Sequence, residues 1–475
     1  MPYVAERVPD LISRLGDAAH LAGDRLVVDD EAAFRGDPIR DLAWTAAFAK
    51  NEATIAAAQW LVREAARELG ALSASIHELY LARARGEIHG FTVPAINLRA
   101  QTFDMARTIY ETAESADVGA VIIEIARSEQ TYTFQRPIDF ATAVLAGAIA
   151  AGWRGPVFLQ GDHYQFNMKK YLADPEAMTE EIRRACRLAL SAGYRNIDID
   201  SSTLVDLSLP SRDEQQHENY VRAAELTALI RSLETDGVTV SVGGEIGEVG
   251  KENSNEEELV AYLEGYRREL EARAPGATGI SKVSVQTGTS HGGVPLPDGT
   301  VAEVKLDFEV LRRLGEVART YGLAGAVQHG ASTLPDELFH RFPAVETAEI
   351  HLATGFQNAL FEHPAFPAEL HHEIETYCFS NALDERKPDQ TDQQFVYTTR
   401  KKAIGPFKRQ LWDLSTKDEI LAAQRRKIGF LFTELGVNGS REMVDRYIRP
   451  VGQRTPPPEG LREAVGAGAS GSAGA

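Results

Sequence analysis

The sequence predicts a (β/α)8 TIM barrel, and three observations support this fold class. Between about residues 76 and 360, short apolar runs of β-type residues alternate with longer amphipathic stretches that are typical of helices. Eight such runs can be counted, which fits a closed parallel barrel better than an open doubly wound sheet. No G-x-G-x-x-G motif follows the first run, so the main sign of a dinucleotide-binding fold is absent.

The elements of the barrel are expected in strict alternation along the chain. The strands are expected at 91–97, 119–125, 156–162, 195–201, 238–246, 281–289, 322–329 and 347–354. Between them, AQTFDMARTIYETAESA repeats apolar residues at spacings of three and four, and PEAMTEEIRRACRLALSAG ends in glycine, as helices often do.

Four regions are expected. Residues 1–75 read as an N-terminal helical extension, packed on the outside of the barrel or on another subunit. Residues 76–366 form the catalytic barrel, and 367–450 form a helical region with the basic patches TTRKKAIGPFKRQ and AAQRRKIGF. Residues 451–475 are rich in Pro, Gly, Ala and Ser and have almost nothing to bury, so we expect a disordered tail.

Composition excludes several classes of protein. With 43% hydrophobic and 25% charged residues, the 475-residue chain has the composition of a soluble globular protein. It contains no apolar stretch long enough to span a membrane. The net charge of −19 argues against nucleic acid as the main partner, because phosphate contacts need clustered Lys and Arg. An anionic small molecule is compatible with it, since a metal and backbone amides can bind phosphate.

The amino terminus and the cysteines indicate a cytoplasmic protein. MPYVAERVPDLISRLGD carries acids early and lacks an apolar h-region, so it does not predict a secretory signal. Two cysteines, Cys186 and Cys378, cannot form a disulfide framework. We therefore expect a reducing compartment.

Three histidines follow expected strands. They are His163 in FLQGDHYQF, His291 in VSVQTGTSHGG and His329 in GLAGAVQHGAS. In a (β/α)8 barrel the loops after the strands share one mouth, where reactive residues gather. Three imidazoles with an open fourth position describe a catalytic Zn²⁺ site. The alternative is that each is an ordinary structural or surface histidine, because the spacing matches no local zinc signature.

Two carboxylates are expected at the same mouth. Asp162 precedes His163 and is either a general acid/base or a partner that orients the metal-binding histidine. Glu245, in VGGEIGEVGKEN, is either an alternative metal ligand or a supporting carboxylate. The loop KENSNEEE that follows is either a lid or a solvated turn.

Two glycine-containing segments are suited to bind an oxyanion. SHGGV follows the sixth strand and HGAST follows the seventh, and exposed backbone N–H groups beside a Ser hydroxyl make an anion-binding site. Barrels often bind phosphate with their last loops. The alternative is that these are ordinary turn residues. The candidates are Gly292, Gly330, Ser332 and Thr354.

These segments resemble the class II, metal-dependent fructose-bisphosphate/tagatose-bisphosphate aldolases. The matching motifs are VPAIN, GDH, GGEIGEVG, GTSHG followed by KLDF, HGAS and IHLAT, and they occur in the order of that family over about residues 76–360. GTSHG with a downstream HGAS is quite specific, whereas VPAIN alone is not.

The resemblance implies a divalent metal, usually Zn²⁺, bound by His163, His291 and His329, with Glu245 near it as an alternate ligand. It implies that Asp162 handles the proton on the hydroxyl of the cleaved carbon–carbon bond. Some members also bind a monovalent cation. Further positions implied by the resemblance are Asn97, near the enediolate, and the phosphate-contacting Gly292, Gly330, Ser332 and Thr354.

Departures from the family pattern affect substrate recognition more than metal binding. His351 stands where an Asn usually contacts the substrate, and Gly355 replaces a nearby acid. Pro295 occupies the place of a lysine, and Glu252 is followed by Asn253 where the family has an acidic pair. The chain is also similar to the non-catalytic subunit of tagatose-bisphosphate aldolase, which lacks the full histidine set.

The leading hypothesis is a reversible aldol reaction on a sugar phosphate, in which Asp162 moves one proton and Glu252 is the candidate for a second. The rival hypotheses are a metal-dependent barrel isomerase or hydrolase, and a barrel subunit that stabilises a partner aldolase. The extra helices at both ends favour a homo-oligomer.

Overall fold

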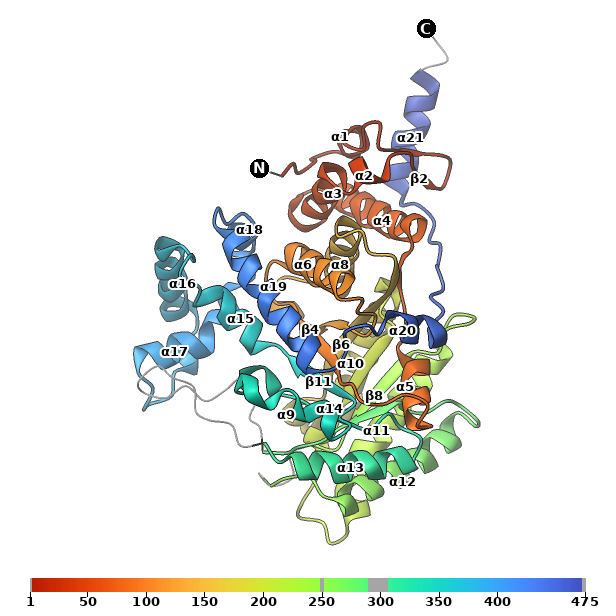
Figure 1. The fold of residues 1–475 in the computed structure, drawn as a ribbon, viewed down its shortest axis with the longest axis vertical. Coiled ribbons are helices and arrows are strands. Elements are labelled where there is room, and N and C mark those ends of the chain that lie inside the picture. Colours follow the sequence, from red (N-terminus) through yellow and green to blue (C-terminus); the bar gives the residue numbers. More distant parts are fainter. Residues whose placement is uncertain (1, 248–251, 289–305, 472–475) are drawn as a thin grey trace.

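A closed parallel barrel forms the centre of the molecule (Figure 1). The computed structural model describes residues 2–247, 252–288 and 306–471, the last six of these without their side chains. The barrel strands are β4 (Val93–Asn97), β5 (Ile122–Ala126), β6 (Gly155–Gln165), β7 (Asn196–Asp200), β8 (Ser241–Glu245), β9 (Lys282–Ser284), β10 (Ala326–Gln328) and β11 (Glu349–Leu352).

Strand pairing confirms the predicted (β/α)8 barrel. Each strand pairs in parallel with its successor, from β4 to β11. The last strand then pairs with the first, with Glu349 opposite Val93, so the sheet closes on itself. All eight expected runs overlap a strand, and most of these strands are shorter than the run, whereas β6 is longer.

The sequence of β7, NIDID, shows how the strands fill the barrel. Its five residues are all buried, and apolar and polar side chains alternate as the period of a strand requires. Ile197 and Ile199 belong to the hydrophobic core, whereas Asp198 contacts the buried Lys282 of β9. The barrel interior therefore holds charged side chains as well as apolar ones.

Helices follow the strands and cover the barrel. In chain order they are α6 (Thr102–Ser115), α7 (Arg127–Tyr132), α8 (Pro137–Ala150), α9 (Met168–Ala173), α10 (Pro175–Ala192), α11 (Arg212–Ser232), α12 (Glu256–Arg273), α13 (Phe308–Thr320), α14 (Arg341–Ala344) and α15 (Thr354–Phe361). Short 3-10 helices lie at Ser202–Leu204, Ala331–Thr333, Asp336–Leu338, Leu383–Glu385 and Arg400–Ala403.

The N-terminal extension packs against its own barrel. It contains α1 (Val8–Ser13), β1 (Ala19–Leu21), β2 (Leu26–Val28), α2 (Glu31–Phe34), α3 (Asp37–Phe48), α4 (Glu52–Leu69) and β3 (Ala71–Ser73), followed by α5 (His77–Ala84). Helices α3 and α4 contact α8, and Gln59 donates a hydrogen bond to Asp139 across this contact at 2.9 Å. The three short strands differ from the all-helical expectation, and β3 pairs in parallel with β6 outside the barrel.

The C-terminal region is mostly helical. It consists of α16 (Ala368–Asn381), α17 (Asp392–Thr399), α18 (Lys408–Trp412), α19 (Lys417–Glu434) and α20 (Arg441–Tyr447). Helix α19 packs on α6, and residues of α15 to α18 form a second hydrophobic cluster beside the main core.

The end of the chain differs from the predicted disordered tail. Residues Glu459–Gly471 form α21, which packs on α4 of the N-terminal extension (Figure 1). Leu461 is buried, and Trp60 donates its indole N–H to the carbonyl oxygen of Thr455 at 2.9 Å. Leu461 therefore anchors a segment for which composition predicted no buried residue. Within the described residues, the helices are all too short or too polar to span a bilayer.

Candidate active site

A cavity of about 460 Å³ opens at the C-terminal ends of the barrel strands. Predicted site residues that line it are Asn97, Asp162, His163, Glu245, His329, Gly330, Ser332, His351 and Thr354. His291 and Gly292 lie outside the described residues, as does Pro295. Glu252 is exposed and does not belong to the described residues that line the cavity.

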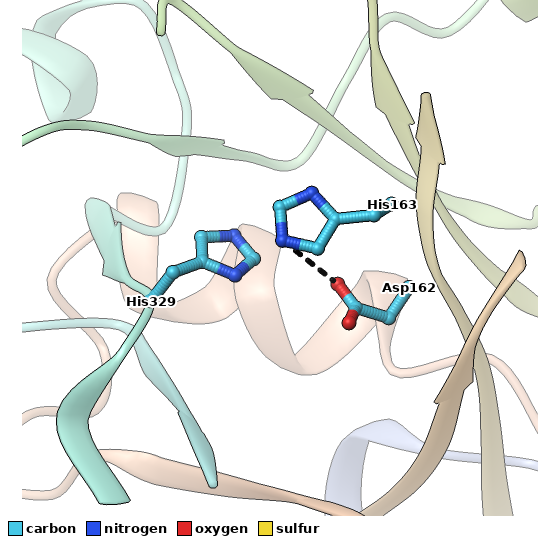
Figure 2. Close-up of side chains that lie close together, drawn as sticks. All are labelled: Asp162, His163 and His329. Atoms are coloured by element: carbon cyan, nitrogen blue, oxygen red, sulfur yellow. Dashed lines mark ion pairs between the residues drawn. The ribbon is translucent and has the colours of Figure 1, made fainter. Parts of the chain in front are cut away.

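A bulge in β6 brings Asp162 and His163 to the same cavity. Neighbouring residues of a regular strand point to opposite faces. Here the register between β6 and β7 shifts between Gly161 and Tyr164, and His163 has a φ of 43°. A positive φ is uncommon outside glycine. The turn of the backbone directs both side chains inward, and His163 Nε2 lies 3.8 Å from Asp162 Oδ1 (Figure 2).

Asp200, at the end of β7, fixes the ring of His163. Its Oδ2 lies 3.0 Å from His163 Nδ1. Asp200 is itself held, because it accepts hydrogen bonds from Gln165 Nε2 at 2.5 Å and from Ser202 Oγ at 2.7 Å. A carboxylate that accepts the Nδ1 proton leaves the Nε2 lone pair available for a metal. The sequence prediction did not include Asp200, although its place at a strand end is a signal that would have found it.

Glu245 lies on the same edge of the His163 ring as Asp200, with Oε2 3.5 Å from Nδ1. Burial and the charge of Asp200 raise the pKa of Glu245 to about 8. Burial alone would lower the pKa of His163, but Asp162, Asp200 and Glu245 together raise it well above its usual value. The carboxylates around His163 therefore favour a positive charge at this place, which a bound cation would supply.

His329 completes a group of side chains that converge in the cavity (Figure 2). Its ring centroid lies 4.3 Å from that of His163, and its Nε2 lies 3.0 Å from Ser284 Oγ. Asp162, His163 and His329 each offer one ligand atom, and these atoms all lie within 4.8 Å of one another. Imidazole and carboxylate are ordinary Zn²⁺ ligands, so this donor set fits a divalent metal.

The loops after β10 and β11 meet on one side of the cavity. Ser332 Oγ accepts a hydrogen bond from the Gly355 backbone N–H at 3.1 Å. A Cβ on Gly355 would lie 2.4 Å from the Ser332 carbonyl oxygen, so the close approach of the two loops requires glycine here. Thr354 begins α15, and Gly330 precedes a 3-10 helix. These residues present backbone N–H groups of the kind that bind anions.

Asn97 ends β4 and lies between a carboxylate and the cavity. Its Nδ2 donates a hydrogen bond to Glu129 Oε2 at 2.7 Å. Its Oδ1 is buried and has no hydrogen-bond partner among the described residues. That oxygen is suited to accept a hydrogen bond from a substrate hydroxyl.

Two cations that the sequence prediction did not include line the cavity, Arg99 and Lys401. Arg99 donates to Glu129 Oε1 at 2.7 Å and to Gln357 Oε1 at 2.9 Å. Burial and the charge of Arg99 lower the pKa of Lys401. Lys401 belongs to the basic patch TTRKKAIGPFKRQ, but only the fold shows that this patch reaches the barrel mouth.

His351 stands where the resemblance implies a residue that contacts the substrate, but its side chain lies deep in the barrel rather than at the rim of the cavity. It lines the cavity, yet it is only 4% exposed, and its ring contacts that of His329 with the centroids 4.0 Å apart. Carboxylates that the sequence prediction did not include surround it, with Glu124 Oε2 at 3.0 Å and Glu349 Oε1 at 2.8 Å. The only signal for Glu124 and Glu349 in the sequence was that each is a charged residue inside an apolar strand.

Comparison with known proteins shows which family the chain belongs to. The family described as fructose-bisphosphate aldolase class-II matches residues 79–408. A comparison with curated proteins found no match.

Three solved structures that are similar to this chain are distant from it in sequence. A probable tagatose 6 phosphate kinase from Sinorhizobium meliloti 1021 has a TM-score of 0.51 at 18% identity, covering 80% of this chain and 98% of its own. The fructuronate-tagaturonate epimerase UxaE from Cohnella laeviribosi has a TM-score of 0.54 at 12% identity, covering 79% and 85%. A fructose-bisphosphate aldolase from Campylobacter jejuni has a TM-score of 0.45 at 17% identity, covering 78% and 97%. At these identities the first two likenesses support the fold alone.

Proposed function

As the chain belongs to the class II fructose-bisphosphate aldolase family, we propose that it cleaves and re-forms a carbon–carbon bond of a ketose phosphate by a metal-dependent aldol reaction. The products are a dihydroxyacetone-phosphate-like ketone and an aldehyde. The observation that carries the proposal is the convergence of Asp162, His163 and His329 in one cavity within the matched region.

The histidines would hold the metal through their ring nitrogens. Ring nitrogens of His163 and His329 lie close enough together to share an ion, which supports this assignment, and the resemblance would add His291 from outside the described residues. When bound, a divalent ion such as Zn²⁺ supplies Lewis acidity at the substrate carbonyl. The contribution of the chain is orientation, because Asp200 fixes one imidazole and Ser284 contacts the other. A monovalent cation near the phosphate stays a prediction.

Asp162 is the proposed proton carrier for the bond that breaks. Its carboxylate is 5% exposed and lines the cavity beside the two imidazoles. During cleavage it takes the proton of the hydroxyl whose carbon becomes the aldehyde, while the bonding electron pair stays with the ketone fragment. During condensation it returns that proton. A second acid must protonate the carbon of the ketone fragment, and the place of Glu245 in the cavity supports it better than the exposed Glu252.

The lining of the cavity supports a substrate that carries both an anion and further polar groups. Backbone N–H groups near Gly330, Ser332 and Thr354 are suited to a phosphate. Arg99 and Lys401 would attract an anionic or hydroxyl-rich part of the substrate, because both are cations that reach the same cavity.

The test combines metal analysis with a retro-aldol screen. The purified chain is expected to hold about one Zn²⁺ and to release triose phosphate from at least one ketose mono- or bisphosphate. His163→Ala should lose metal and activity together, because it removes a ligand. Asp162→Ala should keep the metal and lose turnover. His217→Ala is the matched control, because His217 lies on α11 with its side chain 54% exposed.

Several outcomes would contradict the proposal. A metal-free wild-type chain would favour a barrel subunit that stabilises a partner aldolase. Formation of an isomeric sugar without triose release would favour an isomerase, and release of inorganic phosphate would favour a hydrolase. Normal turnover of Asp162→Ala would overturn the role of that carboxylate alone.

We also propose a homo-oligomer in the cytoplasm, as the sequence predicts. The helices of the N-terminal extension support a homo-oligomer less than expected, because α3 and α4 pack on α8 of their own barrel. Light scattering of the purified chain measures the oligomeric state, and a monomer at micromolar concentration would contradict the proposal.

A further inference from the structure

A cluster of polar side chains fills the barrel interior at the base of the cavity, which two of its members line. The proposed mechanism uses none of them. Burying ionised groups is costly unless each is paired and hydrogen-bonded. We therefore ask which contacts of each member pair its charge, and whether any member also contacts the candidate active site. We call it the core cluster, and it consists of Glu124, Gln160, Asp198, Lys282, Glu349 and His351, each at most 6% exposed.

Lys282 and Glu349 form the fixed base of the core cluster. Lys282 Nζ lies 2.6 Å from Glu349 Oε1, 2.8 Å from Gln160 Oε1 and 3.0 Å from Asp198 Oδ1. The other carboxylate oxygen of Glu349 accepts a hydrogen bond from the Tyr80 hydroxyl. The ammonium thus uses its three donors, and Glu349 is held through both of its oxygens.

His351 lies at ion-pair distance from two carboxylates of the cluster. Its Nε2 lies 2.8 Å from Glu349 Oε1, and its Nδ1 lies 3.0 Å from Glu124 Oε2. Glu124 is fixed in turn, because Gln160 Nε2 donates to its Oε2 at 2.9 Å and also donates to Glu349 at 2.8 Å. One glutamine therefore ties together both carboxylates that lie next to the imidazole.

The His351 ring also contacts two residues of the candidate active site, His329 and Asp162. Its centroid lies 4.0 Å from that of His329, with the two planes tilted by 34°. Its Nδ1 lies 3.4 Å from Asp162 Oδ1. His351 is thus the member of the core cluster that reaches both a proposed metal ligand and the proposed proton carrier.

We propose that His351 is a positioning residue, which transmits the fixed geometry of the core cluster to the Asp162 carboxylate. The inference rests on the proposed function, in which Asp162 carries the proton. A smaller or more flexible side chain at this position would leave space beneath Asp162, and its carboxylate would turn away from the reacting hydroxyl. Misplacement of a reactive group by about 1 Å costs on the order of 100-fold in rate.

The first test separates positioning from binding. His351→Gln removes the ring that contacts both Asp162 and His329, so kcat should fall about 10- to 100-fold while KM and bound Zn²⁺ stay within about threefold. His351→Asn is the more compact polar variant and should recover part of the loss if its amide reaches Asp162. The matched control is His77→Gln, because His77 is also buried but lies on α5, outside the cavity.

The second test asks whether His351 acts through Asp162. Asp162→Glu displaces the carboxylate, so adding His351→Gln to it should cost less than about twofold further in kcat. Losses that multiply in the double variant would overturn the inference, as would unchanged kcat in both His351 variants.

A structural measurement decides the inference without activity. In crystals of the zinc-loaded His351→Gln and His351→Asn variants, we expect the Asp162 carboxylate to move relative to the wild type in at least the first. An unchanged carboxylate in both variants would overturn the inference. If the wild type cleaves no ketose phosphate, the proposed function fails, and this comparison still decides whether His351 positions Asp162.

Discussion

Asp200 shows how a single carboxylate can decide which nitrogen of a histidine is available to a metal. It lies 3.0 Å from His163 Nδ1 and is 1% exposed. In Asp200→Asn the charge is lost and the amide can present either its oxygen or its nitrogen to the ring, so His163 is less well oriented. We expect Zn²⁺ affinity to fall about 10- to 100-fold, measured by competition with a chelator.

The control for this change is Asp206→Asn, since Asp206 is an exposed carboxylate in the loop that follows the same strand. Equal affinity of the Asp200→Asn variant and the wild type would show that Asp200 does not orient the ring.

His77 makes the stability of the protein depend on pH. Burial, together with the charge of Arg231, lowers the pKa of His77 to about 4. Between pH 4 and 6.5 the unfolded chain therefore binds more protons at this residue than the folded chain does, so stability falls as the pH falls. Relative to His77→Gln, the wild type should lose about 1.4 kcal/mol between pH 7.5 and pH 5.5.

The measurement is urea unfolding of both proteins at the two pH values. Other titrating groups are common to both chains and cancel in the comparison. A difference between the two proteins that does not change with pH would contradict the lowered pKa.

Single residues differ in how far the sequence could predict them. His163, His329 and Asp162 were predicted because strand ends of a parallel barrel share one mouth, and they do line one cavity. Arg99 and Lys282 were not, because their partners are Glu129 and Glu349, at distances along the chain that no local pattern encodes.

At the scale of elements, the bulge in β6 is what lets two neighbouring residues serve one cavity. A Cβ on Gly161 would lie 2.4 Å from Cε2 of Tyr164, whose ring is buried. Gly161→Ala should therefore force the bulge to change, turn Asp162 and His163 apart, and lower both Zn²⁺ content and kcat at least tenfold. Metal analysis and the retro-aldol assay measure this effect.

Gly429→Ala is the control for this substitution, because the nearest atom to a Cβ there is Thr112 Cγ2 at 3.8 Å and the residue lies within α19. It should leave activity unchanged and stabilise the helix by up to about 1 kcal/mol. A Gly161→Ala variant with wild-type metal content would show that the bulge tolerates a side chain.

The barrel strands were predictable as elements, whereas the short strands were not. Runs such as GAVIIEI and RNIDIDS carry enough β-branched residues to define a strand by themselves. The strands β1, β2 and β3 have three residues each, and β3 exists because it pairs with β6, more than 80 positions later in the chain. The positive φ of His163 depends likewise on pairing, and no propensity of histidine predicts it.

At the scale of the whole molecule, one aromatic cluster joins three regions of the chain. Trp412 of the C-terminal region lies 5.7 Å from Trp44 and 5.2 Å from Phe48 of the N-terminal extension, measured between ring centroids. It also stacks on Phe103 of the barrel helix α6 at 6.5 Å. Both ends of the chain are therefore built onto the barrel at a common point rather than attached as independent units.

This arrangement predicts that damage to the cluster reaches the substrate cavity without touching the metal. Trp412 is 2% exposed, so Trp412→Ala should lower the free energy of unfolding by about 3–5 kcal/mol. It should also loosen the segment that carries Lys401 into the cavity, which raises KM while Zn²⁺ content stays at the wild-type value. Urea unfolding, kinetics and metal analysis on one preparation measure all three quantities.

Trp412→Phe keeps an aromatic ring in the cluster and should retain most of both properties, which makes it the control for lost volume. If Trp412→Ala lost its metal along with its stability, the barrel and the C-terminal region would unfold as one unit. An unchanged KM in a clearly destabilised variant would instead show that the segment around Lys401 is held to the cavity by its own contacts. In the expected result, the ends of the chain stabilise substrate binding, while the barrel alone holds the metal site.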